Sequence, residues 1–112
     1  MTGQFNHFNA YAPLTEVQAR DYGVRRYGMI AMTHFDVLDK ALEGKQYLVG
    51  DEYSIADMAM FPWVRCHSWA GVSIDGLDAL AAWIARIDAR PAVRRALQLP
   101  APAPRFLAEY DR

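Results

Sequence analysis

Length, composition and charge restrict this chain to an ordinary globular domain. It has 112 residues, of which 53% are apolar and 22% are charged, and its net charge is −1. A chain of this length fits one domain with one hydrophobic core, and the composition is not that of a disordered segment. The balanced charge gives no general attraction to nucleic acid or to anionic membranes, so we expect neither as a partner.

Cysteine and histidine usage excludes several classes of site. The single cysteine, Cys66, cannot form an internal disulfide, which suits a reducing compartment, and we expect the cytoplasm. No group of Cys, His or carboxylate residues has zinc or calcium spacing, so no metal is expected. Cys66 and His67 are neighbours in a helical region and do not face each other, so we assign no catalytic residue.

The first third of the chain predicts a short helix followed by a long one. Residues 4–11 have helical spacing before Pro13, which disfavours a helical residue ahead of it. The chain can restart at Thr15, a plausible cap, and apolar side chains then repeat at steps of three and four. These are Val24, Tyr27, Ala31, Phe35, Leu38 and Leu42. Gly44 fits just after the last turn.

The remainder predicts three more helices and no sheet. A nearly uncharged helix follows Ser54 and should be the buried centre, an amphipathic helix spans 77–87, and Pro91 opens another that runs to about Leu97. The fold class is therefore all-α, a bundle of about five helices. We expect one domain over residues 1–112, with a helical core over 1–97 and a proline-rich tail over 98–112.

Ser54 and Asp57 have the spacing of a capping box. The Ser54 hydroxyl can accept from the amide of Asp57, while the Asp57 carboxylate reaches back to the amide of Ser54. A catalytic carboxylate is the alternative role for Asp57, but no second acid or histidine stands at a suitable spacing. We therefore interpret both residues as a structural cap.

Aromatic residues on the central helix leave two interpretations open. Phe61, Trp63 and Trp69 can line a pocket for an aromatic ligand, or they can belong to the core. Large apolar residues on a central helix are usually core, which favours the second interpretation.

The segment 47–59 (YLVGDEYSIADMA) resembles the loop and capped helix of glutathione transferase carboxy-terminal domains. Residues 3–9 (GQFNHFN) and the pair Arg26-Tyr27 are similar to the nu-class bacterial enzymes, which reduce disulfides with glutathione, and to a related fungal nitrogen regulator. Residues 61–64 (FPWV) and 90–93 (RPAV) extend the resemblance, which covers the chain from Gly3 to about Leu97.

The resemblance implies a parent protein of two domains. In that family an amino-terminal thioredoxin-like domain binds glutathione and activates its thiol, and the helical domain shapes the pocket for the second substrate. The thioredoxin-like domain is expected to be absent from these 112 residues. Glutathione is then a co-substrate of the full protein rather than a tightly bound cofactor, and its partner is a small electrophile or disulfide.

The resemblance also implies roles for individual residues. Arg26 matches an arginine that holds a glutathione carboxylate, a task that suits a guanidinium fork, and Gln4 is a second candidate for binding glutathione. His7, Phe8 and Tyr11 match the helix that lines the cleft between domains, so they are candidates for the second-substrate pocket. Trp63, from the aromatic group described above, is a further candidate. Without the resemblance, Arg26 would be interpreted as part of a surface ion pair.

Two functional hypotheses follow. The first is the pocket-forming and dimer-forming half of a glutathione transferase, inactive by itself, which conjugates glutathione or reduces disulfides in the full protein and forms a homodimer or otherwise self-associates. The second is a non-catalytic module for protein–protein interaction, because helical domains of this type also serve as scaffolds. An exposed apolar patch would favour the second.

Overall fold

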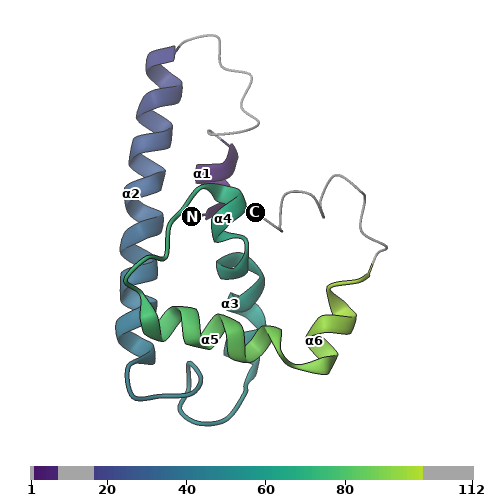
Figure 1. Cartoon of the computed structure of the whole chain (residues 1–112). Coiled ribbons are helices and arrows are strands. Elements are labelled where there is room, and N and C mark those ends of the chain that lie inside the picture. The colour runs from purple at the N-terminus through teal and green to yellow at the C-terminus, as the bar shows by residue number, and fades with distance from the viewer. Residues whose placement is uncertain (1, 8–16, 100–112) are drawn as a thin grey trace.

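The described part of the chain is built from six helices (Figure 1). The computed structural model describes residues 2–7 and 17–99. The helices are α1 (Thr2–Asn6), α2 (Val17–Leu42), α3 (Ile55–Arg65), α4 (His67–Ala70), α5 (Asp78–Asp88) and α6 (Pro91–Ala96). The predicted all-α class is confirmed, and the short α4 is the helix that the sequence pattern did not predict. Within the described ranges the only β-type pairing is an isolated bridge between Tyr47 and Gly50.

The long helix α2 supports the rest of the fold. Its 26 residues extend about 39 Å at 1.5 Å per residue. Ala31, Phe35 and Leu42 are buried on one face, and Gly44 takes the left-handed conformation just after the helix, as expected from sequence. Figure 1 shows α2 along one side of the molecule, with α5 crossing its lower part, and both α1 and α5 pack against it. The proposed cap Thr15 lies outside the described residues.

The capped helix α3 is buried on one stripe only. Asp57, Phe61 and Val64 recur at steps of four and three and are buried, so they lie on one face of the helix. The opposite surface is open to solvent, with Ile55 82% and Trp63 61% exposed. Burial of α3 is therefore narrower than its apolar composition predicts.

Helix α5 supplies the most deeply buried side chains. Leu80, Trp83 and Ile87 are fully buried, and the Trp83 ring packs edge-on against Phe61 with the ring centroids 6.0 Å apart. Burial of a large apolar side chain contributes about 1.5–3 kcal/mol. The docking of α5 on α2 and α3 therefore provides much of the stability of the core.

Two arginines, Arg86 on α5 and the α6 N-cap residue Arg90, connect these helices to the loop that precedes α3. Arg86 donates to the carbonyl of Gln46, and the guanidinium of Arg90 lies 3.8 Å from the centroid of the Tyr53 ring. A cation held over an aromatic face is attracted by about 0.5–1 kcal/mol at an exposed site. These two contacts therefore help to hold the loop against α5 and the start of α6.

The Ser54–Asp57 capping box is present at the start of α3. The Ser54 hydroxyl accepts from the first-turn amides, including that of Ala56 at 3.3 Å, and the Ser54 amide donates to Oδ2 of Asp57 at 2.9 Å. The same hydroxyl donates to that oxygen at 3.1 Å. Local hydrogen bonds thus fix where α3 begins.

The other oxygen of Asp57 joins three parts of the fold. Although the residue is 0% exposed, Oδ1 accepts from the Leu48 amide at 3.0 Å and from Nε1 of Trp83 at 2.8 Å. Burial raises the pKa of this carboxyl, but the four hydrogen bonds to the charged form outweigh it and hold the pKa below its ordinary value of 3.8. Asp57 is therefore a buried, ionised junction between the loop, α3 and α5.

Candidate functional site

A groove of about 580 Å³ opens where α1, α2 and α3 meet. Its lining residues are Gly3, Gln4 and His7 from α1 and its end, Ala31, His34, Phe35 and Leu38 from α2, and Met60, Trp63 and Val64 from α3. The positions on α2 repeat at steps of three, one and three, and those on α3 at steps of three and one. This spacing brings them to one face of each helix. Helical periodicity therefore builds the two long walls of the groove.

The short helix α1 forms the remaining wall. Its Phe5 is buried, and an added Cβ on Gly28 of α2 would lie 3.2 Å from the Phe5 ring. A glycine at this position therefore lets the ring approach α2 closely. Gly3 lies beside the Trp63 ring, where an added Cβ would make an ordinary contact at 3.8 Å. These contacts place the polar side chains Gln4 and His7 at the rim of the groove.

The groove combines an apolar floor with a few hydrogen-bonding groups. Its described lining contains no Lys, Arg, Asp or Glu, and its polar side chains are the amide of Gln4 and the imidazoles of His7 and His34. Nδ1 of His34 lies 2.6 Å from the carbonyl oxygen of Ile30. A carbonyl oxygen only accepts, so Nδ1 carries the proton and Nε2 of a neutral ring is an acceptor. The lining therefore suits an apolar ligand with a few polar groups.

The structure brings together three of the residues that the sequence proposed for ligand binding. Gln4, His7 and Trp63 all line the groove, and Trp63 contributes an exposed ring rather than core packing. Arg26 does not line it, because this residue is exposed elsewhere on α2. A role for Arg26 in glutathione binding would need a ligand that extends beyond the groove, and it stays a prediction. Phe8 and Tyr11 lie outside the described residues.

Sequence reasoning missed His34 and Met60 as lining residues. His34 follows the buried Ala31 by three residues and precedes Leu38 by four, so the helical period already placed it on the same side of α2. The same spacing relates Met60 to Trp63 and Val64. The sequence did not show which side of α2 would face α3.

The remaining reactive side chains are used for local structure. Sγ of Cys66 donates to the carbonyl of Pro62 at 2.8 Å, and Nδ1 of His67 lies 2.9 Å from the carbonyl of Val72 and donates to it. The described residues contain no group of three or more His, Cys, Asp or Glu side chains that could hold a metal ion. No helix among them is both long enough and apolar enough to cross a membrane.

Residues 31–91, more than half of the chain, match the family described as the C-terminal domain of glutathione S-transferase. The chain belongs to this family. Among curated glutathione S-transferase relatives, it is 38% identical to the disulfide-bond oxidoreductase YfcG of Escherichia coli over 87% of its own length and 43% of that protein. It is 39% identical to the disulfide-bond oxidoreductase YghU of the same organism over 83% of its length and 33% of that protein.

Solved glutathione transferases have the same helical arrangement. A structure from Burkholderia graminis, with two glutathione molecules bound per subunit, superposes with a TM-score of 0.80 at 34% identity and covers 91% of this chain and 44% of that one. A structure from Pseudomonas putida, with one glutathione disulfide bound per subunit, has a TM-score of 0.74 at 32% identity and covers 89% and 44%. This chain thus spans less than half the length of these relatives.

Proposed function

We propose that this chain forms the substrate-pocket half of a glutathione transferase that reduces disulfides with glutathione. The observation that carries the proposal is the groove, in which an apolar floor and the polar groups of Gln4, His7 and His34 converge. Two relatives named disulfide-bond oxidoreductases support this reaction over conjugation, as does a similar structure that holds glutathione disulfide.

The proposed reaction divides the work between two parts of a larger protein. A glutathione thiolate attacks one sulfur of the substrate disulfide, forms a mixed disulfide and releases the other half as a thiolate. The groove binds and orients the substrate, with the Trp63 ring against its apolar part and Gln4 and His7 hydrogen-bonded to its amides or carboxylates. We assign thiol activation to the thioredoxin-like domain that the resemblance implies. The 112 residues alone should therefore not catalyse disulfide reduction.

Glutathione disulfide is the probe for this proposal. Calorimetric titration into the chain should show binding that Trp63→Ala weakens by about tenfold, since removing an aromatic face from a pocket loses one to two kcal/mol. Ile55→Ala is the matched control, because Ile55 is also exposed on α3 but lies outside the groove. Binding that is absent, or equally affected by both substitutions, would contradict the groove as the ligand site.

A coupled assay tests the division of work. The 112-residue chain, given glutathione, a small disulfide and a glutathione-recycling system, should show no reduction above the uncatalysed rate. Turnover at rates typical of enzymes, about 1–1,000 per second, would show that thiol activation resides within this chain. If the chain bound neither glutathione nor its disulfide, the alternative of a non-catalytic interaction module would be favoured.

The proposal includes self-association and a cytoplasmic location. Exposed methionines on α2 and the exposed side of α3 provide apolar surface for contact between copies of the chain. The single cysteine suits a reducing compartment.

A further inference from the structure

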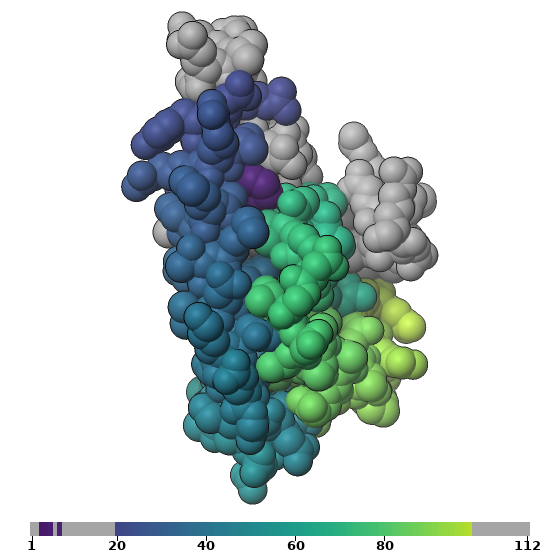
Figure 2. Space-filling model, turned by 60° about the vertical axis from the view of Figure 1, so that its left-hand side comes forward, coloured from purple at the N-terminus to yellow at the C-terminus, as the bar shows by residue number. Residues whose placement is uncertain are grey.

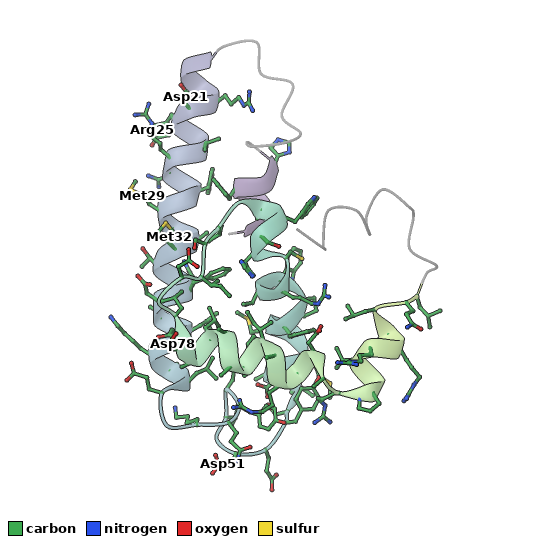
Figure 3. All side chains as sticks on the ribbon, in the orientation of Figure 1. Asp21, Arg25, Met29, Met32, Asp51 and Asp78 are labelled. Carbon is green, nitrogen blue, oxygen red and sulfur yellow. The ribbon has the colours of Figure 1, made fainter. Side chains whose placement is uncertain are left out.

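His34 is the polar side chain that α2 contributes to the described lining of the groove. It follows Ala31 by three residues and precedes Leu38 by four, so it shares the groove side of α2 with them. Figure 3 shows Met29 leaving α2 on the side away from the other helices. His34 follows Met29 by five residues, and five steps of about 100° turn it about 140° away from that side. The imidazole is therefore directed toward the interior side of α2.

The neighbours of α2 limit how a ligand can reach His34. Figure 2 shows a face on which side chains of α2 lie directly against those of α5 and of the loop before it, and the two helices pack together. The described lining of the groove comes instead from α2, α3 and α1 with its end. A ligand therefore reaches His34 from the side of α1 and α3.

One ring nitrogen of His34 is held by the helix, and the other is left for a ligand. Nδ1 lies 2.6 Å from the carbonyl oxygen of Ile30, one turn earlier, and donates its proton to it. This bond fixes the tautomer and the orientation of the ring. Nε2 has no hydrogen bond to the described residues, and in the neutral ring it is an acceptor. The α2 wall of the groove therefore presents a hydrogen-bond acceptor of fixed direction.

The surroundings of His34 are mainly apolar. Phe35 and Leu38 lie beside it on α2, and Met60 and Trp63 belong to the wall that α3 supplies. No Lys, Arg, Asp or Glu is found in the described lining, so a charged ligand group would lose water there without gaining a partner of opposite charge. An uncharged group with an apolar body and one N–H or O–H donor fits both the walls and the acceptor.

We propose that His34 selects the substrate of the groove, namely a disulfide with an uncharged, apolar arm that carries an N–H or O–H donor. The arm is the organic group on the substrate sulfur that lies in the groove. The Trp63 ring packs on the body of the arm, and Nε2 of His34 accepts from its donor. An arm with only an acceptor leaves Nε2 unpaired, which is how a polar site rejects an analogue. The inference rests on the proposed function, because it names the substrate class of the same groove.

Glutathione disulfide satisfies only part of this requirement. Its amide N–H groups can donate to Nε2 of His34, but its carboxylates and ammonium groups find no charged partner in the described lining. Disulfides with uncharged aromatic arms are therefore the better probes of His34.

Two aromatic disulfides that differ in one donor test the inference. Bis(para-hydroxyphenyl) disulfide has an O–H group on each arm, whereas bis(para-methoxyphenyl) disulfide keeps the oxygen and loses the donor. In calorimetric titration of the chain, the hydroxyl probe should bind about fivefold more tightly, which is the effect of one hydrogen bond. His34→Leu should abolish this preference and leave the affinity for the methoxy probe unchanged, because leucine has no acceptor.

Thr33→Val is the matched control. Thr33 is exposed, and its hydroxyl also donates to the carbonyl one turn earlier, that of Met29 at 2.9 Å, but it does not line the groove. This variant should keep the preference for the hydroxyl probe. Trp63→Ala should weaken both probes by the same factor, because the ring contacts the body that their arms share. If His34→Leu and Thr33→Val acted alike on the two affinities, a merely structural role of His34 in α2 would be shown and the inference overturned.

NMR of the imidazole nitrogens gives an independent readout. Proton–nitrogen correlation distinguishes the protonated from the unprotonated ring nitrogen, and His34→Leu identifies the signal of His34 among the three histidines. In weakly alkaline solution, where imidazoles are neutral, the proton should be on Nδ1. The Nε2 signal should shift when the hydroxyl probe binds and much less when the methoxy probe binds. A proton on Nε2, or equal shifts with both probes, would refute the assigned role.

The outcomes distinguish this inference from the proposed function. If both probes bind in a manner that depends on Trp63 but show no preference that depends on His34, the inference is overturned and the groove proposal stands. Tighter binding of bis(para-carboxyphenyl) disulfide than of the hydroxyl probe would overturn the requirement for an uncharged arm. If neither glutathione disulfide nor any aromatic probe binds, the groove proposal fails and this inference fails with it.

Discussion

Replacing Asp57 with alanine should destabilise the domain far more than loss of a helix cap. Capping residues contribute about 1 kcal/mol on average. The substitution also leaves the Leu48 amide and the indole N–H of Trp83 without their acceptor. Each buried donor left unsatisfied costs about 1–3 kcal/mol. We therefore expect a loss of about 3–7 kcal/mol, a large fraction of the stability of a domain of this size.

Urea denaturation followed by circular dichroism measures this loss. Asp57→Asn should cost less stability, since its amide oxygen can still accept from Leu48 and Trp83. Its NH₂ group cannot accept from the Ser54 amide, so that one hydrogen bond is lost. Asp51→Ala, at an exposed acid in the preceding loop, should stay within about 0.5 kcal/mol of the wild type. If Asp57→Ala cost no more than about 1 kcal/mol, the two tertiary hydrogen bonds would contribute nothing, and the role assigned to this carboxylate would be refuted.

Two further predictions concern pH and the end of α4. Because the folded-state pKa of Asp57 lies below 3.8, its ionised form stabilises the fold above pH 3.8, and this stability is lost as pH falls through the folded-state pKa. The urea midpoints of the wild type and Asp57→Asn should therefore converge below that pH, and a constant difference down to about pH 2 would contradict the linkage. Gly71 ends α4 in the left-handed conformation, with φ of 77°, so Gly71→Ala should cost about 1–2 kcal/mol in the same assay, whereas an unchanged midpoint would show that the turn relaxes.

The local signals in the sequence predicted the helices well because they depend on near neighbours. The steps of three and four in α2, the Ser54–Asp57 box and Pro91 at the start of α6 all act within one or two helical turns, and each is found in the structure. What the local pattern could not contain is the bond from Asp57 to Trp83, which spans 26 residues. The sequence therefore identified the cap but underestimated how much of the fold depends on it.

The candidate site was predicted only in part, because sequence patterns report near neighbours and not which elements pack together. Gln4, His7 and Trp63 line one groove, while their roles in binding stay predictions. Composition favoured a core role for Trp63, but its ring is exposed. Apolar composition measures how much surface a helix can bury, not which part of it another element covers. Likewise, periodicity alone placed His34 on a face of α2 without showing that this face bounds a groove.

The small size of α1 has a consequence for any ligand of the groove. One wall is a helix of five residues, which is too short to be stable by itself, and among its described side chains Phe5 is the one buried against the rest of the domain. Its conformation therefore depends on contacts with the rest of the domain, and any undocked fraction would raise the apparent dissociation constant of a ligand in the groove. A ligand that contacts Gln4 and His7 would in turn favour the docked position of α1. The affinity for that ligand and the order of α1 would then depend on the same free energy of docking.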